Sequence, residues 1–294
     1  MDAQGHERVR NVGVIAPINL NDCFSHARLL CYPCQVGNEQ CERQPTMEDY
    51  QLALRLAFTQ WGLPCQLQVD HAAPFFDNHT TSPYPTRLHQ WLLALDIELL
   101  FSQRATDQGL TERSHQLWHQ QCLEQTAPFA DWMHLYTTLL SRRDHLNHAL
   151  PCRTTDHLPP LVACPAAHHS GRFYHPQHEA SLLDLHRLEA FLARNHWFRR
   201  LSRDGAFSLG AEVYYVGKAY AHQQIEITFD PADTCFHTFA ADGSLLKTLP
   251  PRNFSCETLM GQFAQLFNLP LFQFQLPLDG HSLQAVRLCD TLAV

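Results

Sequence analysis

The sequence predicts an α/β domain, a mixed sheet with flanking helices, followed by a small all-β barrel and a C-terminal tail. Three observations predict it. Near the N-terminus, apolar segments with strand-like spacing are joined by turns. Up to about residue 125, segments with helical and strand-like spacing then alternate. From residue 197, short β segments are separated by turn signals, including two Asp-Gly pairs.

The N-terminal segment predicts a three-stranded antiparallel meander. Residues 8–20 have the pattern of two strands joined by a turn, with Asp2 on the first of them, and residues 27–36 have that of a third. Pro33 favours an edge position or a bulge in the third strand. A helix then begins at the N-cap Thr46 and ends at Gly62.

The next segments alternate between strand and helix. A strand leads to Asp70, a helix covers residues 86–95, a strand covers 97–101, and a helix that carries Glu112 runs to about residue 125. The order β-β-β-α-β-α-β-α predicts a mixed sheet with helices on its faces. We therefore place one α/β domain at residues 1–125.

Three further regions complete the predicted organisation. Residues 126–196 form a helical and irregular linker, which includes a helix at 181–194. Residues 197–250 form the small β-barrel. Residues 251–294 form a tail with one helix, at 256–267.

Composition bounds the function. Hydrophobic residues make up 45% of the 294 residues and charged residues 17%, which is typical of a globular protein. A formal charge of −8 argues against a surface wholly devoted to nucleic acid but permits a local basic face. Eleven cysteines, an odd number in a long chain, indicate reduced thiols. With no membrane-span or secretory pattern, we expect a cytoplasmic protein.

Three acids are candidates for one metal site. Asp70 ends an apolar strand, Glu112 lies on a helix, and Asp2 lies on the first strand. Carboxylates suit Mg²⁺ or Mn²⁺, and a pair of such ions supports phosphoryl transfer on nucleic acids. The first and fourth strands would be sheet neighbours, with the helix packed across their ends. Asp22 is the alternative third acid, although we expect it to cap the turn before Ser25.

Five ordered motifs carry a resemblance to a known family. These are Met1-Asp2-Ala3-Gln4-Gly5-His6, Asn21-Asp22-Cys23-Phe24-Ser25-His26, Val69-Asp70-His71-Ala72-Ala73-Pro74-Phe75, the segment from Leu88-His89-Gln90-Trp91-Leu92 to Asp96-Ile97-Glu98-Leu99, and Thr106-Asp107-Gln108-Gly109-Leu110-Thr111-Glu112-Arg113-Ser114-His115. Over residues 1–125 the chain resembles the integrase catalytic core of retroviral-integrase-like DDE transposases from bacterial insertion sequences. Residues 197–250 resemble the small barrel that follows this core in such transposases. Ala72 and Pro74 stand where the family has a glycine and an acid.

The resemblance implies a fold and a reaction. The core would be RNase-H-like, with Asp2, Asp70 and Glu112 as catalytic ligands of two Mg²⁺ or Mn²⁺ ions. The reaction would be DNA cleavage at transposon ends followed by strand transfer into target DNA. It implies a homo-oligomer on DNA, in a nucleoid-associated bacterial protein. Relatives carry an upstream helix-turn-helix region that we expect this chain to lack.

Basic residues predict a DNA-binding face. On the Glu112 helix these are Arg113 and His115, and in the barrel they are Arg199, Arg200 and Lys218. For Arg199, Arg200 and Lys218, the ordinary surface of a barrel without DNA-binding function is an equally good explanation.

Other functions remain open. The chain could be a truncated or repurposed core that binds DNA or a full-length transposase without cutting, or a stand-alone nuclease of the same fold. Cys31, Cys34 and Cys41 could suggest zinc, but a second pair at finger spacing is missing. The histidine-rich segment 168–178 could bind metal, but a solvated linker explains it better.

Overall fold

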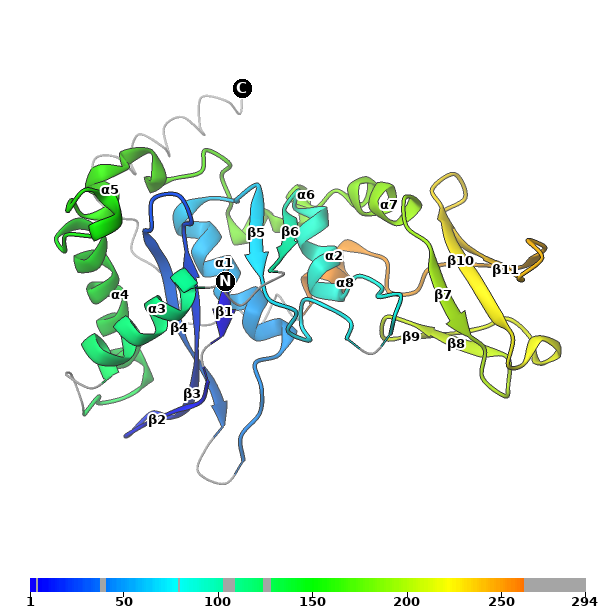
Figure 1. Cartoon of the computed structure of the whole chain (residues 1–294), viewed down its shortest axis with the longest axis horizontal. Helices are drawn as coiled ribbons and strands as arrows, with labels where there is room; N and C mark the ends of the chain where they lie inside the picture. Colours follow the sequence, from blue (N-terminus) through cyan, green and yellow to red (C-terminus); the bar gives the residue numbers. More distant parts are fainter. Residues whose placement is uncertain (4, 38–40, 79, 103–108, 124–127, 262–294) are drawn as a thin grey trace. The chain divides into compact units, whose positions relative to one another are not determined.

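The structure is a computed structural model, and it confirms a mixed α/β protein (Figure 1). It describes residues 1–3, 5–37, 41–78, 80–102, 109–123 and 128–261. In chain order the strands and α-helices are β1 (Asp2–Ala3), β2 (Glu7–Val9), β3 (Gly13–Asn21), β4 (Arg28–Gly37), α1 (Met47–Trp61), β5 (Gln66–Val69), α2 (Arg87–Ala94), β6 (Glu98–Phe101), α3 (Gly109–Trp118), α4 (Trp132–His148), α5 (Pro160–Ala163), α6 (Glu179–Leu182), α7 (Leu185–Ala193), β7 (Trp197–Arg200), β8 (Ala206–Leu209), β9 (Glu212–Tyr215), β10 (Gln224–Asp230), β11 (Cys235–Phe239), β12 (Leu245–Leu249) and α8 (Cys256–Met260).

The N-terminal strands form the predicted antiparallel meander. β1 and β2 both pair with β3, and β4 also pairs with β3. Asp2 is opposite Asn19 and Glu7 is opposite Ile15, so β1 and β2 follow β3 as one interrupted strand. The register between β3 and β4 shifts twice, which is the irregularity that a proline-containing strand favours.

β5 and β6 form a parallel pair, with Gln66 opposite Glu98. The Met1 nitrogen donates a hydrogen bond to the Gln68 carbonyl oxygen, 2.7 Å away. The chain entering β1 therefore runs beside β5. A strand that continues in this register places Asp2 level with Asp70.

Helices flank the N-terminal sheet. α1 begins with a capping box, in which Thr46 and Asp49 each bond to the other's main-chain nitrogen. Figure 1 shows α3 and α4 on one side of β3 and β4 and α1 on the other. On the side of α3 and α4, a buried cluster includes Ile15, Cys31 and Trp118. Because the sheet is covered on both faces, nearly all of β3 is buried.

The segment between α4 and α7 is irregular, as predicted, and most of its side chains are exposed or half-buried, although a few are buried. Glu179 is fully buried and accepts two hydrogen bonds from the Arg55 guanidinium, at 2.7 and 2.8 Å. The helix predicted at 181–194 is interrupted: Leu183 is extended, and Asp184 caps a new helix by accepting from the His186 nitrogen. The Asp184 side chain thus caps the start of α7.

The C-terminal strands differ from the predicted closed barrel. Among the described residues, β12, β11, β10 and β7 form an open antiparallel sheet, and β8 pairs only with β9. The Arg199 guanidinium donates to the Ser208 carbonyl oxygen at 3.0 Å, so a side chain rather than a backbone ladder joins β7 to β8. Because the joining bond comes from a side chain, these strands do not close on themselves.

Contacts group residues 1–261 into one compact unit. The predicted boundaries at 125, 196 and 250 stay predictions. The helix predicted at 256–267 is described only as α8, which ends before Gly261 at a φ of +68°. The rest of that predicted helix and the tail lie outside the described residues.

Candidate metal centre

Asp2 projects from β1 on the face that α3 covers. Its partner in the β1–β3 register is Asn19, whose next partner across the sheet is Cys31. Directly paired residues of antiparallel strands project to the same side, so Asp2, Asn19 and Cys31 form one row. Cys31 packs in the cluster that includes Trp118 of α3. The row therefore lies beneath α3.

Asp70 follows directly after β5. One of its carboxylate oxygens accepts a hydrogen bond from the Ala72 nitrogen at 3.0 Å, which folds the chain into a turn. The other carboxylate oxygen has no hydrogen bond to described residues.

Two ionisable groups respond to both aspartates. Burial raises the pKa of Tyr50, and the charges of Asp70 and Asp2 raise it further. Burial lowers the pKa of the Met1 amino group, while the charges of Cys23, Asp2 and Asp70 oppose that shift. Tyr50 and the Met1 amino group therefore both lie close enough to the Asp2 and Asp70 carboxylates for those charges to shift their pKa values. The fold thus brings Asp2 and Asp70 into the same region, although they are far apart in the sequence.

Glu112 lies in α3, and its side chain lies outside the described part of the structure. His115, one turn later on the same helix, is partly buried. Burial and then the charge of the Met1 amino group lower the pKa of His115 to about 4.

Asp22, the alternative third acid, has a structural role. One of its carboxylate oxygens accepts hydrogen bonds from the Ser25 nitrogen at 2.7 Å and the Ser25 hydroxyl at 2.6 Å. These bonds close the turn between β3 and β4, as predicted. The turn also approaches β5, because the Cys23 thiol lies 3.9 Å from the side-chain oxygen of Gln68.

Polar atoms without partners lie on the same side of the sheet. Asn19 is fully buried, and neither its amide nitrogen nor its amide oxygen has a hydrogen-bond partner among the described residues. The same holds for Nε2 of His115 and Nε1 of Trp118, both on α3. Such orphans are rare in folded proteins and require an explanation. Sequence reasoning missed Asn19, a polar residue within an apolar strand.

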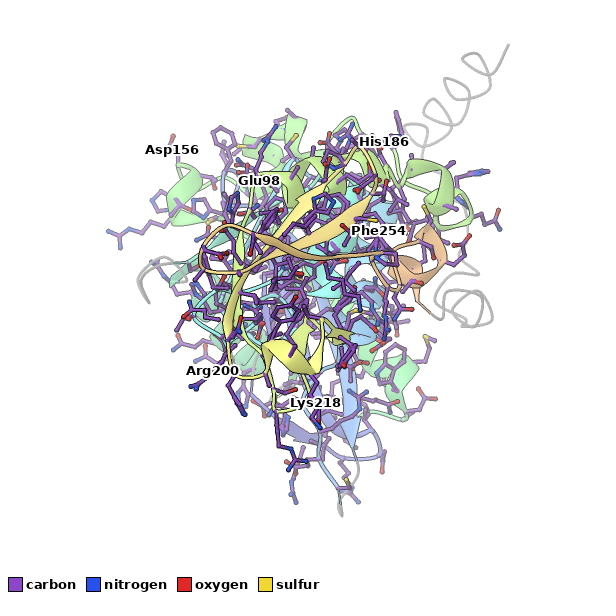
Figure 2. The ribbon with its side chains drawn as sticks, turned by 90° about the vertical axis from the view of Figure 1, so that its right-hand side faces the viewer. Glu98, Asp156, His186, Arg200, Lys218 and Phe254 are labelled. Carbon is purple, nitrogen blue, oxygen red and sulfur yellow. The ribbon has the colours of Figure 1, made fainter. Side chains whose placement is uncertain are left out.

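The predicted basic face is only partly available. The Arg199 guanidinium donates to the carbonyl oxygens of Ser82 at 2.7 Å and Ser208 at 3.0 Å, and burial lowers its pKa. Arg200 and Lys218 are exposed, and both lie along the lower margin of the sheet in Figure 2. Arg113 is exposed on α3. Arg199 thus joins β7 to its neighbours, while the other three face solvent.

The cysteine and histidine candidates do not come together. Among the described residues, neither the cysteines nor the histidine-rich segment supplies a group of three ligands close enough for one ion. Cys31 and Cys34 are buried on opposite sides of β4, whereas Cys41 is exposed. His175 and His178 lie with ring centres 5.6 Å apart. Neither arrangement supports zinc.

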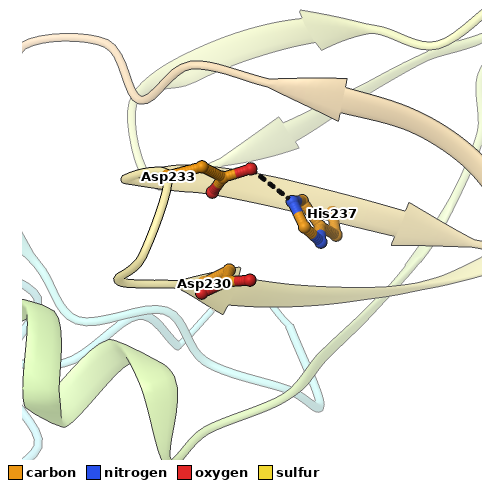
Figure 3. A group of neighbouring side chains, drawn as sticks. All are labelled: Asp230, Asp233 and His237. Carbon is orange, nitrogen blue, oxygen red and sulfur yellow. Dashed lines mark hydrogen bonds and ion pairs between the residues drawn. The ribbon is translucent and has the colours of Figure 1, made fainter.

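One other group could suggest a metal site (Figure 3). The ligand atoms of Asp230, Asp233 and His237 lie within 4.8 Å of one another at the turn between β10 and β11. The aspartates accept hydrogen bonds from the nitrogens of Ala232 and Cys235, and Asp233 pairs with His237 at 2.9 Å. These bonds explain the group as a well-formed turn.

No family model matches the sequence, and no curated protein matches it. Within the described part of the chain, every helix is too short or too polar to cross a membrane. The candidate site therefore stands on the geometry of Asp2, Asp70 and α3.

Proposed function

We propose that the protein is a DDE-type transposase or integrase with an RNase-H-like core, which cleaves DNA and transfers strands with the aid of divalent cations. One observation carries the proposal: Met1, beside Asp2, donates a hydrogen bond to Gln68, two residues before Asp70. The charges of both aspartates act on the Met1 amino group and on Tyr50, so the two carboxylates lie in one region of the protein. β4, β3 and β1 are neighbours in one sheet, and β5 and β6 form a separate parallel pair. The bond from Met1 to Gln68 links β1 to β5, which supports the strand order expected of that fold.

The residues present fit a hard divalent cation. Asp2 and Asp70 offer carboxylate oxygens, which Mg²⁺ and Mn²⁺ prefer. Asp2, Asp70 and Glu112 would hold two such ions.

The chemistry follows from that placement. When bound, the two cations would activate the attacking water or 3′-hydroxyl and stabilise the leaving oxygen. The protein holds Asp2 on a paired strand and Asp70 in a closed turn, so both carboxylates are positioned before DNA arrives. Arg200, Lys218 and Arg113 would contact the DNA backbone.

The proposal is tested by incubating the protein with supercoiled plasmid DNA and Mn²⁺ or Mg²⁺. We expect nicking that Asp70→Asn reduces at least 100-fold. Glu98→Gln is the matched control: Glu98 pairs with Gln66 and lies about 13 Å back along the strand direction from Asp70. Wild-type protein that never nicks DNA, or nicking that survives in Asp70→Asn, would contradict the proposal.

The alternative function, a core that binds without cutting, has its own outcome in the same experiment. It predicts DNA binding by wild type and Asp70→Asn alike, with no metal-dependent nicking in either. A stand-alone nuclease would nick the plasmid but would not join a labelled 3′-hydroxyl end to it. Transfer of the labelled end separates that nuclease from a transposase.

A further inference from the structure

Asn19 is a buried polar residue whose burial nothing so far explains. It lies in β3, within an apolar run, and its side chain is fully buried. Both polar atoms of its amide lack hydrogen-bond partners among the described residues. Leaving a buried amide unsatisfied costs about 1–3 kcal/mol, so a valine or leucine here would give a more stable strand.

The position of Asn19 relates it to the candidate site. Because Asn19 and Asp2 are direct partners on antiparallel strands, their Cβ atoms are about 5 Å apart and both side chains project toward α3. A side chain of this length reaches the carboxylate of its partner, or a water bound between them. On its other side Asn19 is opposite Cys31, a buried residue that offers no strong acceptor.

We propose that Asn19 is a positioning residue of the divalent-cation site, and the proposal rests on the function proposed above. Its amide N–H would hold the Asp2 carboxylate, and its amide oxygen would accept a hydrogen bond from water on the cation. Partners of this kind fix the orientation of metal ligands, and their loss typically reduces metal affinity about 10- to 100-fold. The burial of an otherwise unsatisfied amide is then explained by the bound state.

The test is Mn²⁺ binding by calorimetry, with thermal unfolding measured in parallel. Asn19→Leu removes the amide and keeps the number and branching of the heavy atoms. We expect it to weaken Mn²⁺ binding about tenfold or more while leaving the Tm unchanged or higher, because an unsatisfied polar group has gone. A purely structural Asn19 predicts a lower Tm with unchanged Mn²⁺ affinity, and that result would overturn the proposal.

A second variant covers the case in which Asn19→Leu does not fold. Asn19→Asp keeps the size and the oxygen donor, so we expect it to keep measurable Mn²⁺ binding that Asn19→Ala loses. Equal Mn²⁺ affinity in all folded variants would also overturn the proposal. Failure of the proposed function looks different, because then the wild-type protein itself binds no Mn²⁺.

Discussion

The Met1 nitrogen and the Gln68 carbonyl oxygen are joined by a hydrogen bond of 2.7 Å, which fixes the register between the start of β1 and β5. This bond brings the start of the chain beside the strand that leads to Asp70. A slip of one residue would turn Asp2 to the opposite face of the sheet, where α1 lies. The candidate site therefore depends on strand pairing as much as on the acids themselves.

Asp22→Asn should leave the candidate site intact. The asparagine oxygen can still accept from Ser25, so the turn between β3 and β4 persists at a cost of about 1 kcal/mol. We expect Mn²⁺ affinity, measured by calorimetry, to stay within about twofold of wild type. A loss as large as that of Asp70→Asn would make Asp22 a ligand.

Glu179→Ala should strongly destabilise the protein. The buried Glu179 carboxylate accepts hydrogen bonds from Arg55, Trp91 and Tyr174, and removing it leaves the Arg55 charge buried without its partner. We expect the free energy of unfolding to fall by about 3–5 kcal/mol, as measured by denaturant titration. The double variant Arg55→Met with Glu179→Leu should recover much of that loss, and failure to do so would show that packing rather than charge dominates.

Stability should fall between about pH 6.5 and pH 4 because of buried histidines. Burial lowers the pKa of His89 to about 4, so the folded state keeps the imidazole neutral. Over this interval the unfolded chain binds a proton that the folded protein does not, so unfolding becomes easier as pH falls, by up to about 3 kcal/mol. His115 is shifted similarly. His89→Phe should therefore remove about half of the pH dependence, measured by denaturant titration at pH 7 and pH 4.5, and an unchanged dependence would contradict this cause.

The basic residues of the C-terminal sheet should separate into two kinds. Arg199→Ala should lower the free energy of unfolding by about 2 kcal/mol, because the guanidinium joins β7 to Ser82 and Ser208. Arg200→Ala and Lys218→Ala should leave stability unchanged and weaken duplex DNA binding. Each should reduce the slope of log affinity against log salt by about one, measured by fluorescence anisotropy. Equal salt slopes in wild type and both variants would exclude these two residues from the DNA interface.

Local signals in the sequence predicted most of the core. Thr46 and Thr86 cap α1 and α2 through their side chains, as their residue types favour, and the apolar strand before Asp70 is present. The bond between each cap and its helix spans only a few residues, so a single sequence contains the signal. The same holds for the turn that Asp70 closes.

Features that depend on distant partners could not be predicted in this way. Whether β-strands close into a barrel depends on which edges meet, and here a side chain of Arg199 takes the place of a strand ladder. The helix around Asp184 looked continuous because apolar spacing does not reveal a capping side chain in the middle. Asn19 could be placed on a strand from its neighbours, but its pairing with Asp2 is visible only in the folded structure.

The most direct test of the candidate site is the Mn²⁺ affinity of wild type, Asp70→Asn, Asp2→Asn and the control Glu98→Gln, measured by calorimetry on the full chain. If Asp2 and Asp70 share a cation, wild type and Glu98→Gln bind Mn²⁺ alike, and each aspartate variant binds at least tenfold more weakly. Mn²⁺ binding that is the same in all four proteins, or absent from wild type, would contradict a metal centre between these strands.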